Sequence, residues 1–170
     1  MVAWYTLVSM SAPEITIRRG EQRDLAVVGE MGAQLVRMHH AFDARRFLTP
    51  PAGVAEGYAA FLDTQLARDD VAVFVADRAG TVVGYVYAGV EPMSWMELRE
   101  EAGFIHDIFV IEAARGSGVA VRLAEAAIAW LAGRGMPRVL LWTVPQNEAA
   151  RRLFGRLGFR QTMMELTREL

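Results

Sequence analysis

The sequence predicts a mixed α/β fold, in which a mostly antiparallel sheet has helices on both faces and contains one central βαβ crossover. β-rich and helical segments follow one another in the order β-α-α-β-β-β-α-β-α-β. Neighbouring β-rich runs favour hairpins, whereas one long helical segment separates two later runs, as a parallel pair requires. No repeat or linker divides the 170 residues. We therefore expect one domain over residues 1–170, with residues 1–12 as a flexible extension.

The first half of the chain supplies a strand, two helices and a hairpin. Residues 14–18 alternate as a strand does, and Asp24 is expected to cap the helix that follows. Residues 42–53 contain Pro50-Pro51 and read as a loop before a second helix, 54–68. The runs 71–76 and 82–87 flank Asp77-Arg78-Ala79-Gly80, which has the composition of a hairpin turn.

The second half contains the predicted crossover. A β-rich run at 104–111 leads into a helical pattern at 116–132, and a strand follows at 139–144. A short helix is expected at 147–157 and a final strand at 159–166. The acidic stretch 97–101 reads as a solvated connection.

Composition excludes several classes of function. The chain has no Cys, which excludes disulfides, thiolate metal sites and a cysteine nucleophile, and no His and carboxylate spacing suggests a metal site. A net charge of −2 gives no reason to expect nucleic acid or an anionic membrane as a partner. No apolar run is long enough to span a bilayer, and the N-terminus lacks the pattern of a signal peptide. We expect a cytoplasmic protein.

The strongest chemical signal is the turn Arg115-Gly116-Ser117-Gly118-Val119-Ala120, between a β-rich run and a long helix. A helix N-terminus has free backbone N–H groups and a partial positive charge, so it can hold phosphate oxygens. Glycine lets a ligand approach the backbone closely, and Arg115 adds a cation. The turn lacks the third glycine and the acidic partner of a dinucleotide-binding fingerprint, and it lacks the Gly-Lys-Ser/Thr of a Walker loop. A glycine-rich helix start that binds nothing is the alternative.

A second segment, one strand further on, decides between these interpretations. Residues 147–159 read Asn-Glu-Ala-Ala-Arg-Arg-Leu-Phe-Gly-Arg-Leu-Gly-Phe. The turn and this segment together resemble the GNAT superfamily of N-acetyltransferases. The turn matches the pyrophosphate motif of that family, and Asn147, Ala150, Phe154 and Leu157-Gly158-Phe159 match its following helix. The close match covers about a third of the chain.

The resemblance implies a GNAT fold that binds acetyl-CoA between two splayed strands. Backbone groups of Ile108, Phe109 and Val110 would pair with the pantetheine amides. The turn from Arg115 to Ala120, with Gly116, Ser117, Gly118 and Val119, would hold the pyrophosphate. Asn147 and Phe154 would contact the cofactor. An amine would attack the thioester directly in a ternary complex.

One departure concerns the acid of the reaction. Many members of the family have Tyr at the position of Phe154, and its hydroxyl protonates the leaving thiolate. Phe154 cannot donate a proton, so another group, water or no acid at all would serve.

His106 and Asp107 are the candidate general bases, because the acceptor amine is mostly protonated at neutral pH. They are adjacent on a predicted strand, so their side chains are expected on opposite faces with only one in the site. A half-buried sheet histidine and a structural carboxylate are the alternative.

Other polar residues have weaker claims. His39 and His40 end the first helix, where a solvated cap is the favoured interpretation, and Tyr85 and Tyr87 are expected to pack in the core. The acceptor amine, on a small molecule or a protein, has no readable motif. A non-catalytic acyl-CoA-binding module of the same fold is the alternative function, and a homodimer is plausible from the resemblance.

Overall fold

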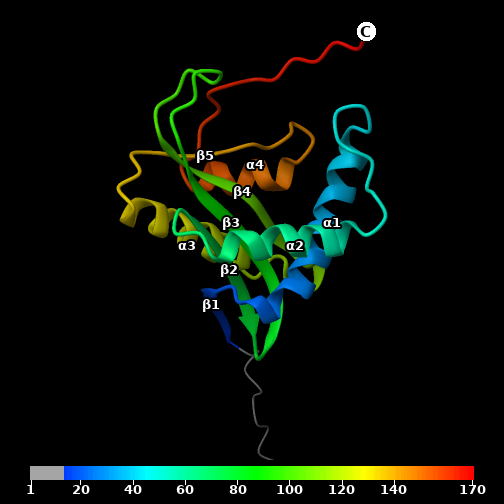
Figure 1. Ribbon diagram of the computed structural model, residues 1–170, viewed down its shortest axis with the longest axis vertical. Coiled ribbons are helices and arrows are strands. Elements are labelled where there is room, and N and C mark those ends of the chain that lie inside the picture. Colours follow the sequence, from blue (N-terminus) through cyan, green and yellow to red (C-terminus); the bar gives the residue numbers. More distant parts are fainter. Residues whose placement is uncertain (1–13) are drawn as a thin grey trace, which may run out of the picture.

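The computed structural model describes residues 14–170 and contains a five-stranded sheet in the order β1-β2-β3-β4-β5 (Figure 1). The first four strands pair antiparallel, and β4 pairs parallel with β5. The elements are β1 (Ile15–Arg19), α1 (Leu25–Phe42), α2 (Val54–Leu66), β2 (Val71–Arg78), β3 (Thr81–Glu91), β4 (Ala102–Val110), α3 (Val119–Gly133), β5 (Val139–Leu141) and α4 (Glu148–Arg156). This is the predicted mixed α/β fold, with α3 forming the crossover between β4 and β5. The expected extension at residues 1–12 lies outside the described residues.

Two apolar layers hold helices against the two faces of the sheet. Leu25, Val28 and Met31 of α1 and Leu62 of α2 pack with one set of strand residues that includes Tyr85. Residues of α3, from Val119 to Leu131, pack with the other set on the opposite face. Each helix buries only one stripe of its surface, which is the pattern that a 3.6-residue period predicts.

The β2–β3 hairpin closes at the predicted turn. Ala79 and Gly80 both have positive φ angles, 49° and 85°, and Arg78 pairs with Thr81 across them. Two central residues in this conformation match the right-handed twist of the flanking strands.

A β-bulge in β4 overturns the prediction that His106 and Asp107 point to opposite faces. Tyr87 of β3 is the partner of Asp107, whereas the next residue, Ala88, is the partner of Ile105, so His106 is an extra residue in β4. Ile105 and Ile108 both lie on the α3 face although they are three positions apart. His106 and Asp107 therefore share the α1–α2 face, because the bulge interrupts the two-residue alternation.

Two local predictions are wrong. Asp24 occupies the position before α1, but its carboxylate accepts hydrogen bonds from Arg18 and from the backbone N–H of Glu21 instead of capping the helix. The buried carboxylate therefore ties β1 to the start of α1, and the hydrogen bonds from Arg18 lower its pKa.

The expected strand at 159–166 is absent from the described chain, where residues 159–170 have no regular secondary structure. Most of their side chains are exposed, and Glu165 pairs with Arg46 of the α1–α2 loop. A segment forms a strand only where a sheet edge accepts its backbone hydrogen bonds, and β5 has only three residues. Within residues 14–170, no helix is long and apolar enough to cross a membrane.

Candidate acyl-transfer site

A cleft opens where β4 and β5 separate. The two strands pair only between Gly103–Ile105 and Val139–Leu141, and the chain continues beyond these pairs without further ladder contacts. The cleft has a volume of about 310 Å³. Its lining comes from α1, the α1–α2 loop, α2, β4, the segment after β5 and α4: Gly32, Leu35, Val36, Met38, His39, Phe47, Leu48, Tyr58, Ile105, His106, Asp107, Ile108, Leu141, Trp142, Thr143, Asn147, Ala150 and Phe154.

The turn before α3 presents free backbone donors. Gly116 and Gly118 have φ angles of 77° and 80°, a region that favours glycine, and a Cβ at either position would meet no atom within 4 Å. The backbone N–H groups from Gly116 to Val121 have no hydrogen-bond partner within the described part of the chain. A run of unpaired donors beside open space at a helix N-terminus fits a phosphate group.

Arg115 is held at this turn by its neighbours. Its Nε donates to the carbonyl of Val110 at 3.0 Å, and its guanidinium lies 5.7 Å from the centre of the Phe109 ring. The side chain of Ser117 donates to the carbonyl of Ala114 at 2.7 Å, so its hydroxyl stabilises the turn. Arg115 remains exposed, which leaves its terminal nitrogens at the surface beside the turn.

The remaining predicted cofactor residues fall into two groups. Ile108 lines the cleft, and so do Asn147 and Phe154. Phe109, Val110 and Val119 are buried, so only their backbone groups could reach a ligand, and Ala120 is partly buried at the start of α3.

Asn147 also makes a structural contact within its own turn. Its Oδ1 accepts a hydrogen bond from the backbone N–H of Ala150 at 3.1 Å, which caps α4. The N–H donors of its amide nitrogen are then the groups that Asn147 can offer to a ligand in the cleft. Phe154 packs edge to face on Phe159, with 5.5 Å between ring centres, and presents only carbon to the cleft.

Asp107 ends a chain of hydroxyl groups. Tyr58 of α2 donates to Asp107 Oδ2, and Tyr85 of β3 donates to the hydroxyl of Tyr58 at 3.0 Å. Burial raises the pKa of Asp107 above its usual range, and the hydrogen bond from Tyr58 opposes that shift. Burial also raises the pKa of both tyrosines well above 10, so each hydroxyl keeps its proton as a donor.

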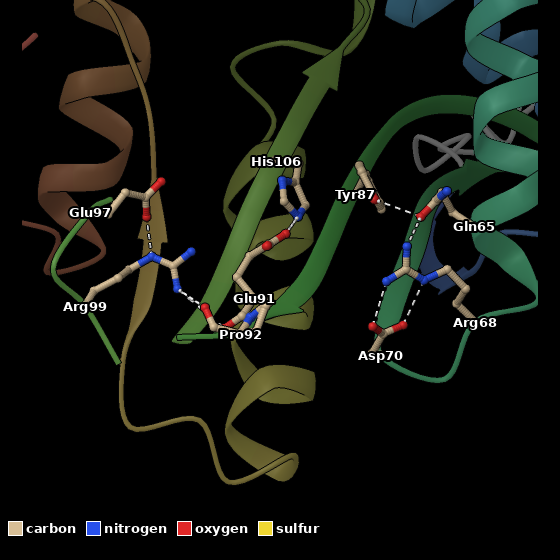
Figure 2. A network of polar contacts seen from close by, with 9 residues as sticks. All are labelled: Gln65, Arg68, Asp70, Tyr87, Glu91, Pro92, Glu97, Arg99 and His106. Carbon is tan, nitrogen blue, oxygen red and sulfur yellow. Dashed lines mark hydrogen bonds and ion pairs between the residues drawn. The ribbon is translucent and has the colours of Figure 1, made fainter. Parts of the chain in front are cut away.

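His106 lies between two aromatic rings. The rings of Tyr87 and Phe104 stack on it at centre distances of 4.7 and 5.0 Å, and its Nε2 lies 3.1 Å from Oε1 of Glu91 (Figure 2). Burial lowers the pKa of His106 below 6.5, while the negative charges of Glu91 and Asp107 act in the opposite direction. The ring is therefore neutral at pH 7 and able to accept a proton.

The cleft includes one residue to which the sequence assigns no role in the site, Tyr58, and one with only a weak claim to it, His39. Tyr58 belongs to an apolar helix stripe, and nothing in its spacing indicates a contact with Asp107, 49 positions away. His39 lines the cleft, with its Nδ1 2.9 Å from the Leu35 carbonyl, although a solvated cap was the favoured interpretation. Tyr85 and Tyr87 are buried as predicted. Within residues 14–170, no group of three His, Asp or Glu is arranged to hold a metal ion.

Comparisons with known proteins agree on the class of fold. The model of the family described as acetyltransferase (GNAT) matches residues 37–159. An aminoglycoside N-acetyltransferase solved in complex with CoA superposes with a TM-score of 0.76 at 21% identity, over 96% of this chain and 99% of that one. A structure titled as a transcriptional regulator from Bacillus halodurans superposes with a TM-score of 0.71 at 22% identity, over 92% of this chain and 100% of that one.

Curated relatives share part of the sequence. An uncharacterized N-acetyltransferase of Methanocaldococcus jannaschii is 36% identical over 96 residues, 56% of this chain and 42% of that protein. An L-2,4-diaminobutyric acid acetyltransferase of Chromohalobacter salexigens is 38% identical over 112 residues, 65% of this chain and 55% of that protein. A mycothiol acetyltransferase of Thermobispora bispora is 34% identical over 98 residues, 54% of this chain and 30% of that protein. This chain thus matches between about a third and about half of the length of these three relatives. With the family model covering most of its described residues, the chain belongs to the acetyltransferase (GNAT) family.

Proposed function

We propose that this protein transfers the acetyl group of acetyl-CoA to a primary amine. The observation that carries the proposal is a combination of two features of β4 and the turn that follows it. His106 and Asp107 lie in the wall of a cleft between separated strands, and free backbone N–H groups lie at the start of α3. The pyrophosphate would lie on the turn from Arg115 to Ala120. The pantetheine arm would lie along the backbone of Ile108, Phe109 and Val110, between β4 and β5.

The reaction requires one proton to leave the amine and one to reach sulfur. The amine nitrogen forms the new C–N bond, the C–S bond breaks, and its electron pair leaves on the CoA sulfur. His106 takes the proton from the amine, with Asp107 as the alternative base. The products are the N-acetylated amine and CoA, whose thiolate is protonated by water, because Phe154 has no proton to donate.

The acceptor is a primary amine of a small molecule or a protein. Relatives are named for diaminobutyric acid and mycothiol, and a solved neighbour was captured with a CoA-linked neamine analogue. These compounds are the ones named for those proteins, and not for this chain. They define the first compounds to test here, because the residues of this cleft from α1 and the α1–α2 loop have no motif that selects among them.

Release of CoA thiol in the presence of acetyl-CoA tests the proposal. The panel consists of 2,4-diaminobutyrate, an aminoglycoside, a polyamine and a peptide with a free N-terminus, each against a no-amine control. The chain has no Cys, so every thiol that reacts with the detection reagent comes from CoA. Tight binding of acetyl-CoA with no thiol release across a broad panel would favour the alternative, a non-catalytic acyl-CoA-binding module.

A cytoplasmic location and a homodimer also remain predictions. Cell fractionation tests the first, and light scattering of the purified protein tests the second.

A further inference from the structure

The side chain of His106 has aromatic and carboxylate neighbours beyond those that the proposed reaction by itself requires. Tyr87 stacks on one face of the ring with an interplanar angle of 27°, and Phe104 stacks on the other with an angle of 21°. Tyr87 is in turn anchored, because its hydroxyl donates to Oε1 of Gln65 at 3.2 Å. Arg68 donates to the same Gln65 oxygen at 3.1 Å and binds Asp70 with two hydrogen bonds (Figure 2). The ring plane of His106 is thus set from both sides.

The edge of the His106 ring that carries Nε2 also has close neighbours, Gly89 and Glu91. Gly89 of β3 leaves room for it, because a Cβ at that position would lie 3.3 Å from His106 Nε2. Glu91, at the end of the same strand, places Oε1 3.1 Å from that nitrogen. Figure 2 shows the second ring nitrogen turned away from Glu91.

His106 separates two cavities. It lines the cleft between β4 and β5, whereas Glu91 and Tyr87 line a neighbouring cavity of about 350 Å³ together with Arg68 and Asp70. Glu91 is not part of the lining of the cleft, so its carboxylate contacts Nε2 from the side of the neighbouring cavity. The charged groups near the ring are Glu91 from β3, Asp107 from β4 and Arg68 from the loop between α2 and β2.

We propose that Glu91 is a positioning residue for His106: it accepts the Nε2 proton and so leaves Nδ1 as the free acceptor toward the reacting amine. A carboxylate only accepts hydrogen bonds at neutral pH, so Nε2 must carry the hydrogen in this contact. In a neutral imidazole the other nitrogen is then the base. The same carboxylate stabilises the imidazolium that forms when Nδ1 takes the proton, as a carboxylate orients a catalytic histidine in hydrolases. This inference rests on the proposed function, with His106 as its base.

The first measurement does not depend on an acceptor. The chain has only three histidines, so nitrogen-15 spectra of the imidazole rings resolve His106 from His39 and His40, with His106→Gln as the assignment variant. We expect an Nε2–H tautomer for His106 in the wild-type protein. In Glu91→Gln the amide can donate to Nε2, so the Nδ1–H tautomer should gain population and the pKa of His106 should fall. Glu101→Gln is the matched control, since Glu101 lines the same cavity as Glu91 and its change removes the same charge.

The second measurement uses the best acceptor from the amine panel. Glu91→Gln should lower kcat at least about 10-fold relative to Glu101→Gln, with the Kd of acetyl-CoA unchanged. Glu91→Asp keeps a carboxylate and should recover part of kcat and of the His106 pKa. Spectra of His106 in Glu91→Gln that match those of Glu101→Gln would overturn the proposal, whatever the activity. Altered spectra with kcat equal to the control would also overturn it. If no amine releases thiol, the proposed function fails, while the spectra still decide whether Glu91 sets the tautomer.

Discussion

The two candidate bases show how neighbours determine the chemistry of single residues. Burial raises the pKa of Asp107 and lowers that of His106, because it disfavours the charged form of each. The shift of Asp107 moves its pKa toward neutral pH, where a general base is most effective. The shift of His106 moves its pKa below 6.5 and so keeps the ring in the neutral form that can accept a proton at pH 7. His106 lines the cleft, and Glu91 contacts its Nε2 but not its Nδ1, whereas one oxygen of Asp107 already accepts from Tyr58.

A pH profile separates the two residues. If His106 is the base, the rate should rise with pH through an apparent pKa below 6.5 and stay level at neutral pH, because the active form is neutral imidazole. His106→Ala should lose that rise and lower kcat by about 10²–10⁴-fold, with the Kd of acetyl-CoA unchanged. Asp107→Asn should remove the rise of the rate with pH only if Asp107 is the base. In that case the rise should occur above pH 3.8, because burial raises the pKa of Asp107. Wild-type turnover of both variants across the pH range would exclude both residues.

Phe154 supports a different prediction at the same scale. It is buried against Phe159 and also lines the cleft. Phe154→Tyr should therefore leave kcat unchanged or raise it, because the tyrosine can protonate the departing thiolate. A loss of about 100-fold with the Kd of CoA intact would instead show that the site depends on an apolar side chain here.

At the scale of elements, the turn before α3 is the part on which cofactor binding should depend most. Replacing Gly116 and Gly118 with Val should weaken the binding of CoA at least about 30-fold, because two charge-assisted hydrogen bonds of about 1.5–3 kcal/mol each are lost. Isothermal calorimetry measures the effect. Gly135→Val is the control, since Gly135 also has a positive φ of 79° and no atom within 4 Å of its Cβ position. An unchanged Kd in the folded double variant would remove the turn from the site.

The packing of α1 on α2 supports a second prediction for elements. A Cβ at Gly32 of α1 would overlap the ring of Tyr58, which donates to Asp107. Gly32→Ala should therefore lower the free energy of unfolding by about 1–3 kcal/mol, measured with urea. Gly57→Ala on α2 meets no atom within 4 Å and should raise it by about 0.5–1 kcal/mol. Equal effects of the two changes would contradict the close approach.

For the whole molecule, cofactor binding and folding are linked. A ligand at 100 times its Kd stabilises the folded state by about 2.7 kcal/mol, which should raise Tm by about 5–10 °C for a chain of this size. CoA should produce this shift in a thermal melt. Pantetheine, which lacks the pyrophosphate, should produce less. The Gly116 and Gly118 double variant, with its Kd raised at least about 30-fold, should keep at most about a third of the CoA shift at the concentration used for the wild type. Equal shifts from CoA and pantetheine would mean that the phosphates contribute nothing.

Much of this architecture is determined locally and can be predicted from the sequence. Two β-rich runs around a turn-forming segment predict the β2–β3 hairpin, and the positive φ angles of Gly116 and Gly118 occur where a glycine-rich turn opens a helix. The segment 147–157 becomes α4 for the same reason, because Asn147 supplies a cap within its own turn. Such features need only contacts between residues close in the chain.

Other features depend on contacts between distant segments. The bulge at His106 follows from the register of β3 against β4, so it brings His106 and Asp107 to one face against the alternation of the strand. The contacts of Tyr58 with Asp107 and of Glu91 with His106 join residues 49 and 15 positions apart. Propensity and spacing carry no information about such pairs. The sequence alone thus determined the order of elements from β1 to α4, the glycine turn and the family, but not the end of the described chain, where the expected strand is absent. The tertiary structure decided which polar groups meet in the cleft, because only packing brings them within hydrogen-bond distance.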